Sequence, residues 1–211
     1  MPLQGSGFWP ACLVLRSAGF CAGLVAIGLL GCGPVWAHGG LGDAKSVWGG
    51  AQHFLTSPLS LAALLGLVAA LFATQERTFL MAAVLASFSA AVAAALPGAL
   101  PAFAAPAAVV VVGFSAVSGL TLPRAAALAL GVLGGAAAGI AADLDAPSWP
   151  GSIGVALALL LPLVGALAAS EDLLKLPRLQ AVLPIARRVL GSWVAAMGLL
   201  IAALALHSAK G

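Results

Sequence analysis

Charged side chains are scarce in this sequence. Only 7% of the 211 residues are charged, whereas 63% are apolar. A soluble domain of this length carries about a quarter charged residues, so the composition excludes a water-soluble globular protein. The stretch 102–120 contains no ionisable group, which is typical of a helix in lipid. The net charge of +3 is too small to indicate a nucleic-acid-binding surface.

Cysteine is missing from most of the chain. The three cysteines all lie near the N-terminus, at Cys12, Cys21 and Cys32. Here Arg16 precedes an apolar run at 18–30 and a small-residue site ending at Ala37, a pattern that predicts a signal peptide over 1–37. Its removal leaves no thiol, which excludes disulfides and cysteine-bound metal. An uncleaved anchor helix and lipidation of Cys32 remain open alternatives.

Catalytic motifs are also absent. The sequence has no Gly-x-Ser-x-Gly, no phosphate-binding loop and no HExxH, and no histidine pair stands at the i, i+4 spacing of haem or di-metal helices. The acidic pair Glu171 and Asp172 lies beside basic residues, as expected of a solvated helix end. We therefore expect no enzymatic activity.

Long apolar segments make up most of the remaining chain. They predict an all-α integral membrane protein, a six-helix transmembrane domain over 53–211 that follows an outer-face loop at 38–52. The six spans are expected at about 53–73, 78–96, 102–120, 125–142, 151–169 and 189–206. Ser57 and Pro58 are expected to act as N-cap and first residue of a helical start, and Pro162 to kink its helix.

A basic segment lies between the last two predicted spans, over 170–188. It contains Lys175, Arg178, Arg187 and Arg188. Leucines separate these residues, and Pro177 and Pro184 interrupt the segment. We interpret it as a cytoplasmic loop that lies on the anionic membrane surface.

The basic residues also predict the orientation. Export of the N-terminus and six crossings place six of them inside the cell, namely Arg77, Arg124, Lys175, Arg178, Arg187 and Arg188. Only Lys45 and Lys210 then lie outside, which agrees with the positive-inside rule. The expected location is the bacterial inner (cytoplasmic) membrane, with both mature termini on the periplasmic side. His38, His53, His207, Asp143 and Asp145 then lie at the outer face.

Three glycines recur at four-residue spacing in the fourth predicted span. They are Gly131, Gly135 and Gly139. Glycines on one helical face let a second backbone approach closely, so they predict a helix-packing seam rather than a ligand site.

The exported start, the glycine-rich loop and the first span, which begins at His53, resemble the HupE/UreJ family of hydrogenase and urease accessory membrane proteins. The resemblance implies six short helices and nickel or cobalt permeation. That family carries an H-P-x-x-G-x-D-H motif at the first span, of which this chain matches the leading His53. Leu59 and Ser60 stand at the positions of the aspartate and the second histidine, and no histidine lies near Gly135 in the fourth span.

A metal site at the exported end is the corresponding hypothesis. After cleavage, the imidazole and α-amino group of His38 can chelate one ion, with His53 adding a nitrogen and Asp43 or Asp143 an oxygen. This donor set suits Ni(II) or Cu(II). The simpler interpretation is that His38 merely follows the cleavage site and that His53 begins a helix at the interface.

Two functions therefore remain open. The first is a membrane metal-handling accessory protein, either a permease for nickel, cobalt or copper or a metal acceptor at the outer face. The second is a non-catalytic structural or assembly subunit of a larger membrane complex, or a homo-oligomer, which packs through small-residue faces. The bilayer is the expected surrounding in both, and nucleic acid is not an expected partner.

Overall fold

The computed structural model describes residues 45–96, 101–144, 148–173 and 177–208, and within these ranges the chain forms seven α-helices and no strand. The helices are α2 (Val47–Thr56), α3 (Pro58–Leu71), α4 (Glu76–Ala95), α5 (Ala104–Ser118), α6 (Arg124–Ala141), α7 (Trp149–Leu173) and α8 (Pro177–Ser208). The predicted signal peptide and the lipidation site at Cys32 lie outside the described residues.

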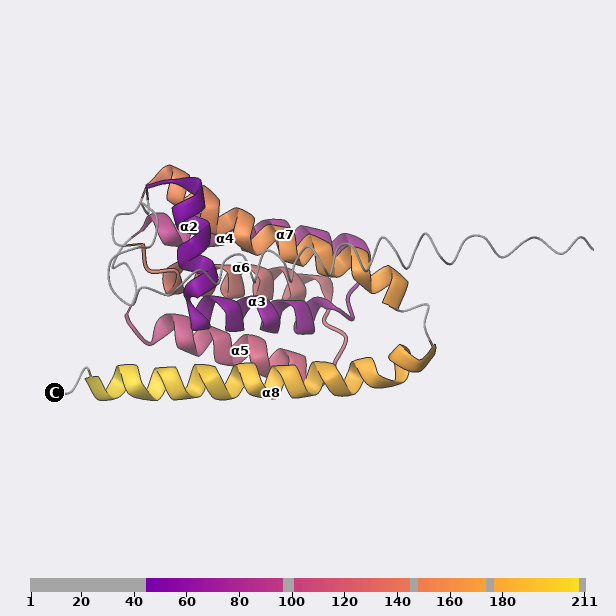
Figure 1. Ribbon diagram of the computed structural model, residues 1–211. Coiled ribbons are helices and arrows are strands. Elements are labelled where there is room, and N and C mark those ends of the chain that lie inside the picture. Colours follow the sequence, from indigo (N-terminus) through magenta and orange to yellow (C-terminus); the bar gives the residue numbers. More distant parts are fainter. Residues whose placement is uncertain (1–44, 97–100, 145–147, 174–176, 209–211) are drawn as a thin grey trace, which may run out of the picture.

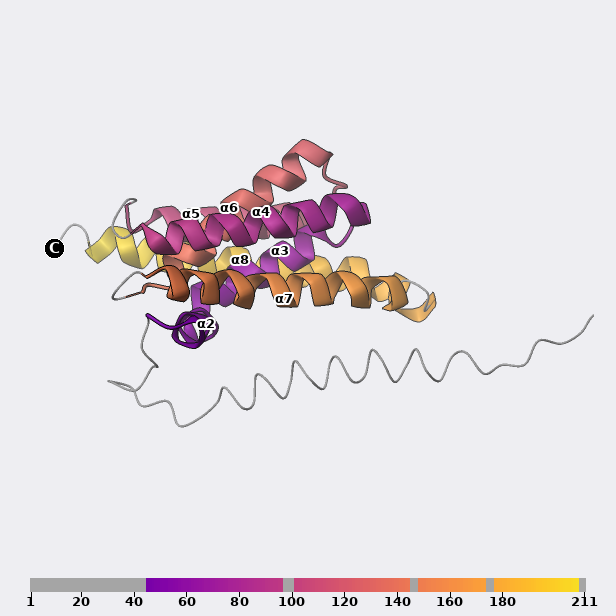
Figure 2. The same cartoon turned by 90° about the horizontal axis from the view of Figure 1, so that it is seen from above.

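Six of the helices, α3 to α8, lie along a common direction, and each runs opposite to the one before it (Figure 1). The remaining helix, α2, crosses one end of this bundle and meets α3 at a bend of 82°. Seen from above, α2 points along the line of sight (Figure 2). We call this end of the bundle the α2 end; it also holds the C-terminal ends of α4, α6 and α8.

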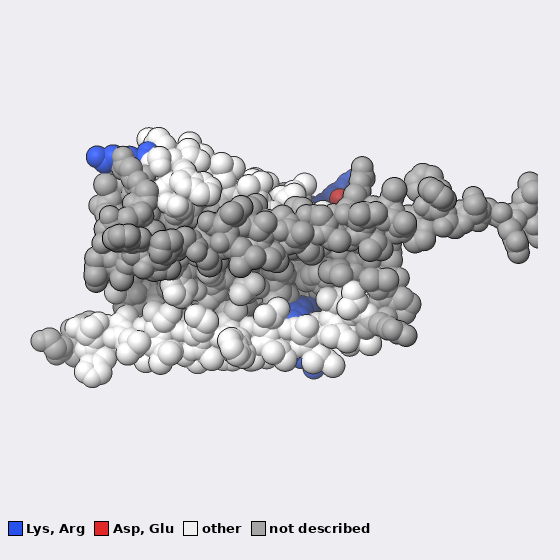
Figure 3. All heavy atoms as spheres, viewed as in Figure 1, with Lys and Arg blue, Asp and Glu red and all other residues white. Residues whose placement is uncertain are grey.

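The opposite end carries most of the described basic residues, and we call it the basic end. Arg77 and Arg124 stand in the first turns of α4 and α6, and Arg187 and Arg188 lie on α8 beside the last turn of α5. Figure 3 shows coloured charged atoms in the right-hand half of the molecule and a second blue group at the left-hand end, with white described atoms between them.

Four helical segments are long and apolar enough to cross a membrane. They are Glu76–Ala95, Arg124–Ala141, Trp149–Ser170 and Leu179–Ser208. The bent pair α2 and α3 supplies a fifth if it is counted as one span, whereas α5 is a shorter apolar helix of 15 residues. The described residues thus form an all-helical protein with four or five spanning helices by length and composition, against the six expected.

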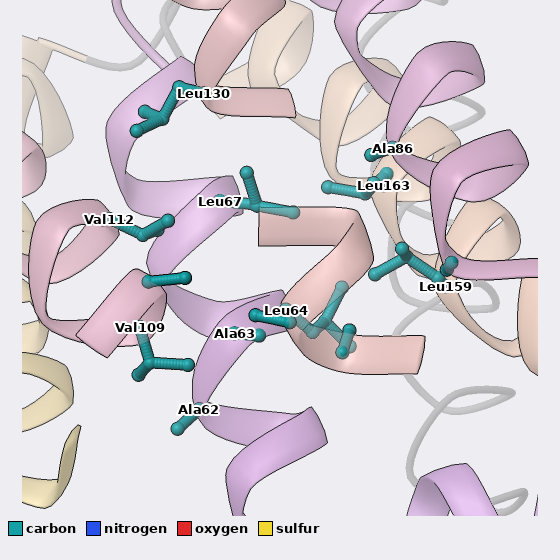
Figure 4. Packing of buried hydrophobic residues seen from close by; sticks show 14 of the residues in the cluster. Ala62, Ala63, Leu64, Leu67, Ala86, Val109, Val112, Leu130, Leu159 and Leu163 are labelled. Carbon is teal, nitrogen blue, oxygen red and sulfur yellow. The ribbon is translucent and has the colours of Figure 1, made fainter. Parts of the chain in front are cut away.

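The core of the bundle is built around α3, in which ten of the 14 residues are buried. Leu64 and Leu67 of α3 lie in one cluster with Val112 of α5 and Leu130 of α6 (Figure 4). Gly66 lets α5 and α8 approach, because a Cβ there would lie 2.8 Å from a Val112 methyl and 3.0 Å from a Val194 methyl. A helix that faces only other apolar helices or lipid is apolar all round, so the sequence of α3 shows no amphipathic period.

The start of α2 corrects the predicted outer-face loop at 38–52. The helix begins at Val47, six residues before the predicted start of the first span at His53. The Ser46 hydroxyl accepts a hydrogen bond from the Gly49 amide at 2.9 Å and so caps the helix. Glycines that suggest a loop instead allow a close contact, because Gly50 packs directly on the Gly151 backbone of α7.

The start of α8 corrects the predicted basic surface loop at 170–188. One helix of 32 residues runs from Pro177 to Ser208, so the sixth helix does not begin at Val189 as expected. Proline is well suited to the first residue of a helix because its missing amide needs no partner there, and Pro177 takes this place. The helix continues through Pro184, as α7 continues through Pro162.

Candidate metal-binding corner

The bend between α2 and α3 is fixed by one side chain, Ser57. Its backbone is extended, with φ −81° and ψ 114°, and its hydroxyl accepts a hydrogen bond from the Ser60 amide at 3.3 Å. The prediction that Ser57 and Pro58 cap and begin a helix is therefore confirmed. The same hydroxyl donates a hydrogen bond to the carbonyl oxygen of Ala141 at 2.7 Å. Because Ala141 ends α6, this bond joins the bend to a carbonyl that lacks a helical partner.

A second hydroxyl ties the same two elements together. Ser60 is fully buried, and its hydroxyl donates to the Ala138 carbonyl oxygen at 3.0 Å. The first turn of α3 is thus attached to the last turn of α6 by two side-chain hydrogen bonds. Such bonds are favourable away from water, where a buried hydroxyl has few other partners.

Two metal-ligating residue types lie within four sequence positions of the residues joined by this attachment. His53 lies one turn before Ser57, is half-buried, and offers an imidazole from the last turn of α2. Asp143 follows Ala141 by two residues and is exposed. We call the group His53, Ser57, Ala141 and Asp143 the α2–α6 corner.

Asp143 has an unusual backbone. Its φ is +45°, in the left-handed region, where aspartate and asparagine are tolerated better than most residues. Its amide donates to the Ile140 carbonyl at 3.2 Å, which closes the end of α6. The turn reverses the chain and leaves the carboxylate at the surface of the α2 end.

The remaining predicted ligands are distributed differently. His38, Asp43 and Asp145 lie outside the described residues. His207 stands exposed in the last turn of α8, at the α2 end (Figure 1). Among the residues with described positions, no three His, Cys, Asp or Glu side chains lie close enough to hold a metal ion together. The corner therefore offers two donors, one nitrogen and one carboxylate.

The predicted glycine seam lies inside the bundle, between α6 and α4. A Cβ at Gly131 would lie 2.6 Å from the Ala82 carbonyl oxygen, and Gly135 and Gly139 meet the Ala86 and Ala90 carbonyls more closely still. Ser89 adds a hydrogen bond across the seam to the Val132 carbonyl at 3.0 Å. The α4 backbone fills the space that a Cβ at each glycine would need, so the three glycines serve the packing of α6 on α4.

At the basic end, two arginines contact the end of α5, an arrangement that was not predicted from the sequence. Arg187 Nη2 donates to the Leu120 carbonyl at 3.1 Å, and the Arg188 guanidinium packs on Gly119, whose φ is +66°. Cations are favourable beside the C-terminal carbonyls of a helix. The sequence did contain a signal for the end of α5, because Gly119 is followed closely by Pro123 and this combination marks a helix end.

Comparison with protein-family models, curated proteins and solved structures finds no match for this chain.

Proposed function

We propose that this chain is a membrane metal-handling accessory protein of the kind that the HupE/UreJ resemblance implies, with a metal acceptor site at the outer face of a bacterial inner membrane. The observation that carries the proposal is the hydrogen bond from Ser57 to Ala141. It holds His53 and Asp143 within a few residues of one contact, although they are 90 positions apart in the sequence.

The donors of the corner suit a borderline divalent ion. An imidazole nitrogen and a carboxylate oxygen bind Ni(II) or Cu(II) well, and the α-amino group and imidazole of His38 would complete a set of four. Lys45 follows His38 by seven positions, a length of chain that can extend to at most about 25 Å. A mature N-terminus at His38 is therefore within reach of the α2 end, where Lys45 stands, and Asp43 lies on the same segment.

The proposed topology is six crossings, with both mature termini on the periplasmic side. It rests on the alternating directions of α3 to α8 and on the basic end, which would face the cytoplasm. Under this proposal α3 and α5 are short crossings. They are tolerated because neighbouring helices rather than lipid surround most of α3.

Isothermal titration of the purified mature protein, whose chain begins at His38, with Ni(II), Co(II) and Cu(II) tests the metal proposal. We expect one equivalent to bind, and the His53→Ala and Asp143→Asn variants to weaken binding by about tenfold or more, the usual effect of losing one ligand interaction. His207→Ala is the matched control and should leave affinity unchanged. Absence of binding, or binding indifferent to His53, removes the proposal.

A second candidate function is a structural or assembly subunit, and the exposure of α8 favours it. In the most apolar stretch of α8 only 22% is buried, against 39–44% in the corresponding stretches of α4, α6 and α7. Trp193, near the middle of this helix, is 71% exposed. A partner helix would pack along α8 and cover it. Purification in a mild detergent tests this: a stoichiometric partner that is lost in Trp193→Ala supports the subunit role, and an uncomplexed protein removes it.

A further inference from the structure

A large apolar cavity lies between the halves of α4 and α6 that are nearest the α2 end. Its volume is about 670 Å³, within the range of about 300–1,000 Å³ that is typical of ligand sites. Phe88 and Val92 of α4 and Val132 and Ile140 of α6 form its walls, and Asp143 is the only ionisable residue among the described ones that line it. The cavity is therefore a long apolar space with an anionic group at one end.

A second, smaller cavity adjoins the first. It has a volume of about 250 Å³ and lies between the end of α4 and the start of α7, where Ser148 and Trp149 line it. Val92 and Leu96 line both cavities and so form a ridge between them. Two apolar compartments thus lie on either side of one ridge, with polar groups at the same end of both.

The position of these cavities indicates what fills them. They lie along helices that are long and apolar enough to span a membrane, and the Phe88 ring at the border of the larger cavity is 68% exposed. An apolar surface at this depth faces hydrocarbon rather than water. The larger cavity extends from Val132 to Asp143, about 16 Å along α6, which is roughly half of a 30 Å hydrocarbon core and hence one leaflet.

We propose that the two cavities bind one phospholipid with two acyl chains and a headgroup that ends in an ammonium group. One acyl chain occupies the larger cavity, and the part of the second chain nearest the headgroup occupies the smaller cavity, on the other side of Val92 and Leu96. The carboxylate of Asp143 pairs with the ammonium, and Trp149 lies at headgroup level, as tryptophan does in membrane proteins. A crossing helix from a partner fits less well, because the larger cavity extends through only one leaflet.

This inference goes beyond the proposed metal function, with which it shares only Asp143. Ala136 lines the larger cavity but offers no metal donor, and His53 does not line either cavity. Ala136→Phe therefore tests lipid binding alone, and His53→Ala tests metal binding alone. Each proposal can fail while the other holds.

The experiment compares lipids that stay bound to the full-length protein. The protein is reconstituted with equal amounts of phosphatidylethanolamine and phosphatidylglycerol, washed with detergent, and the retained lipid is counted by native mass spectrometry. We expect one phosphatidylethanolamine per chain, preferred over phosphatidylglycerol by about fivefold, the size expected of one exposed ion pair. The variant Asp143→Asn should reduce this preference to about one. Asparagine tolerates the positive φ of this position, so the backbone should keep its conformation.

Ala136→Phe should lower the total retained lipid severalfold, because the ring fills the space of one chain. The matched control is Ala196→Phe, which adds the same ring to an exposed alanine of α8. Ala93→Leu, a smaller change in the same cavity, replaces Ala136→Phe if that variant does not fold. Equal retention of both lipids by the unaltered protein, or full retention when the cavity is filled, overturns the proposal. A cross-linking probe placed at position 88 should react with lipid. Cross-linking to another protein instead also overturns the proposal.

Discussion

At the scale of single residues, the few polar side chains buried among the described residues mostly bond to backbone carbonyls. The buried Ser60 and the half-buried Ser57 and Ser89 each bond to a backbone carbonyl of α6. These contacts lie between segments far apart in the sequence, and no local pattern marks them. The cap at Ser57 was predictable because N-cap chemistry is local, whereas its bond to Ala141 was not.

Removal of the Ser60 hydroxyl should destabilise the protein modestly. Ser60→Ala deletes the bond to Ala138, and bonds of this kind contribute about 0.6 kcal/mol on average and about 1.7 at most in a membrane protein. Unfolding in a graded series of SDS mixtures measures the loss. Ser192→Ala, an exposed serine of α8 that bonds only within its own helix, should change stability by less than about 0.5 kcal/mol. Equal effects of the two substitutions would contradict this assignment.

A side chain at Gly135 should be more damaging. A Cβ there would overlap the Ala86 carbonyl oxygen, so Gly135→Leu must force α4 and α6 apart. Overpacking of this kind costs about 1–3 kcal/mol or more. Thermal melting in detergent, followed by light scattering, provides the measurement. Ala129→Leu adds a similar bulk to an exposed position of the same helix and should melt like the unaltered protein; a Gly135→Leu melt that matches it would show that the seam is loose.

At the scale of the helices, composition predicted the apolar cores of the elements but not all of their ends. The runs that become α4, α5 and α6 were located to within two residues, because turn residues such as Gln75, Pro123 and Gly119 limit them. The predicted starts of α2 and α8 were wrong, because residues that usually interrupt a helix do not interrupt these two. Gly49 and Gly50 suggested a loop, but the close contact at Gly50 keeps this segment helical. Pro184 suggested a break, but α8 continues through it because the helix tolerates the missing amide.

A substitution that weakens the contact between α2 and α7 should detach α2 without unfolding the rest of the bundle. Gly50 packs on the Gly151 backbone, and Gly154 meets the Val47 carbonyl, so the α2–α7 contact depends on absent side chains. Gly50→Leu should raise the hydrogen exchange of amides 47–56 severalfold and leave α4 and α6 protected. Thr56→Leu, at an exposed position of α2, is the control. Uniform deprotection of all the helices would mean that α2 is part of one cooperative unit.

At the scale of the whole molecule, the central claim is that the two ends of the bundle lie on opposite sides of a membrane. The basic end has Arg77, Arg124, Arg187 and Arg188, and the α2 end has His53, Asp143 and His207. Charge counting along the sequence predicted this separation, because short loops keep basic residues close to the ends of their helices. The α2–α6 corner could not be predicted, since it depends on which helices are neighbours. The proposed metal site requires the α2 end to face outward.

Cysteine labelling in intact cells tests that claim most directly. Single cysteines at Thr74 and Thr121 mark the basic end, and single cysteines at Trp149 and Ser208 mark the α2 end, in a chain whose own three cysteines are replaced by serine. The account predicts that a membrane-impermeant maleimide labels positions 149 and 208 in intact cells, and positions 74 and 121 only after permeabilisation. Labelling of all four from one side, or the reverse pattern, would contradict it.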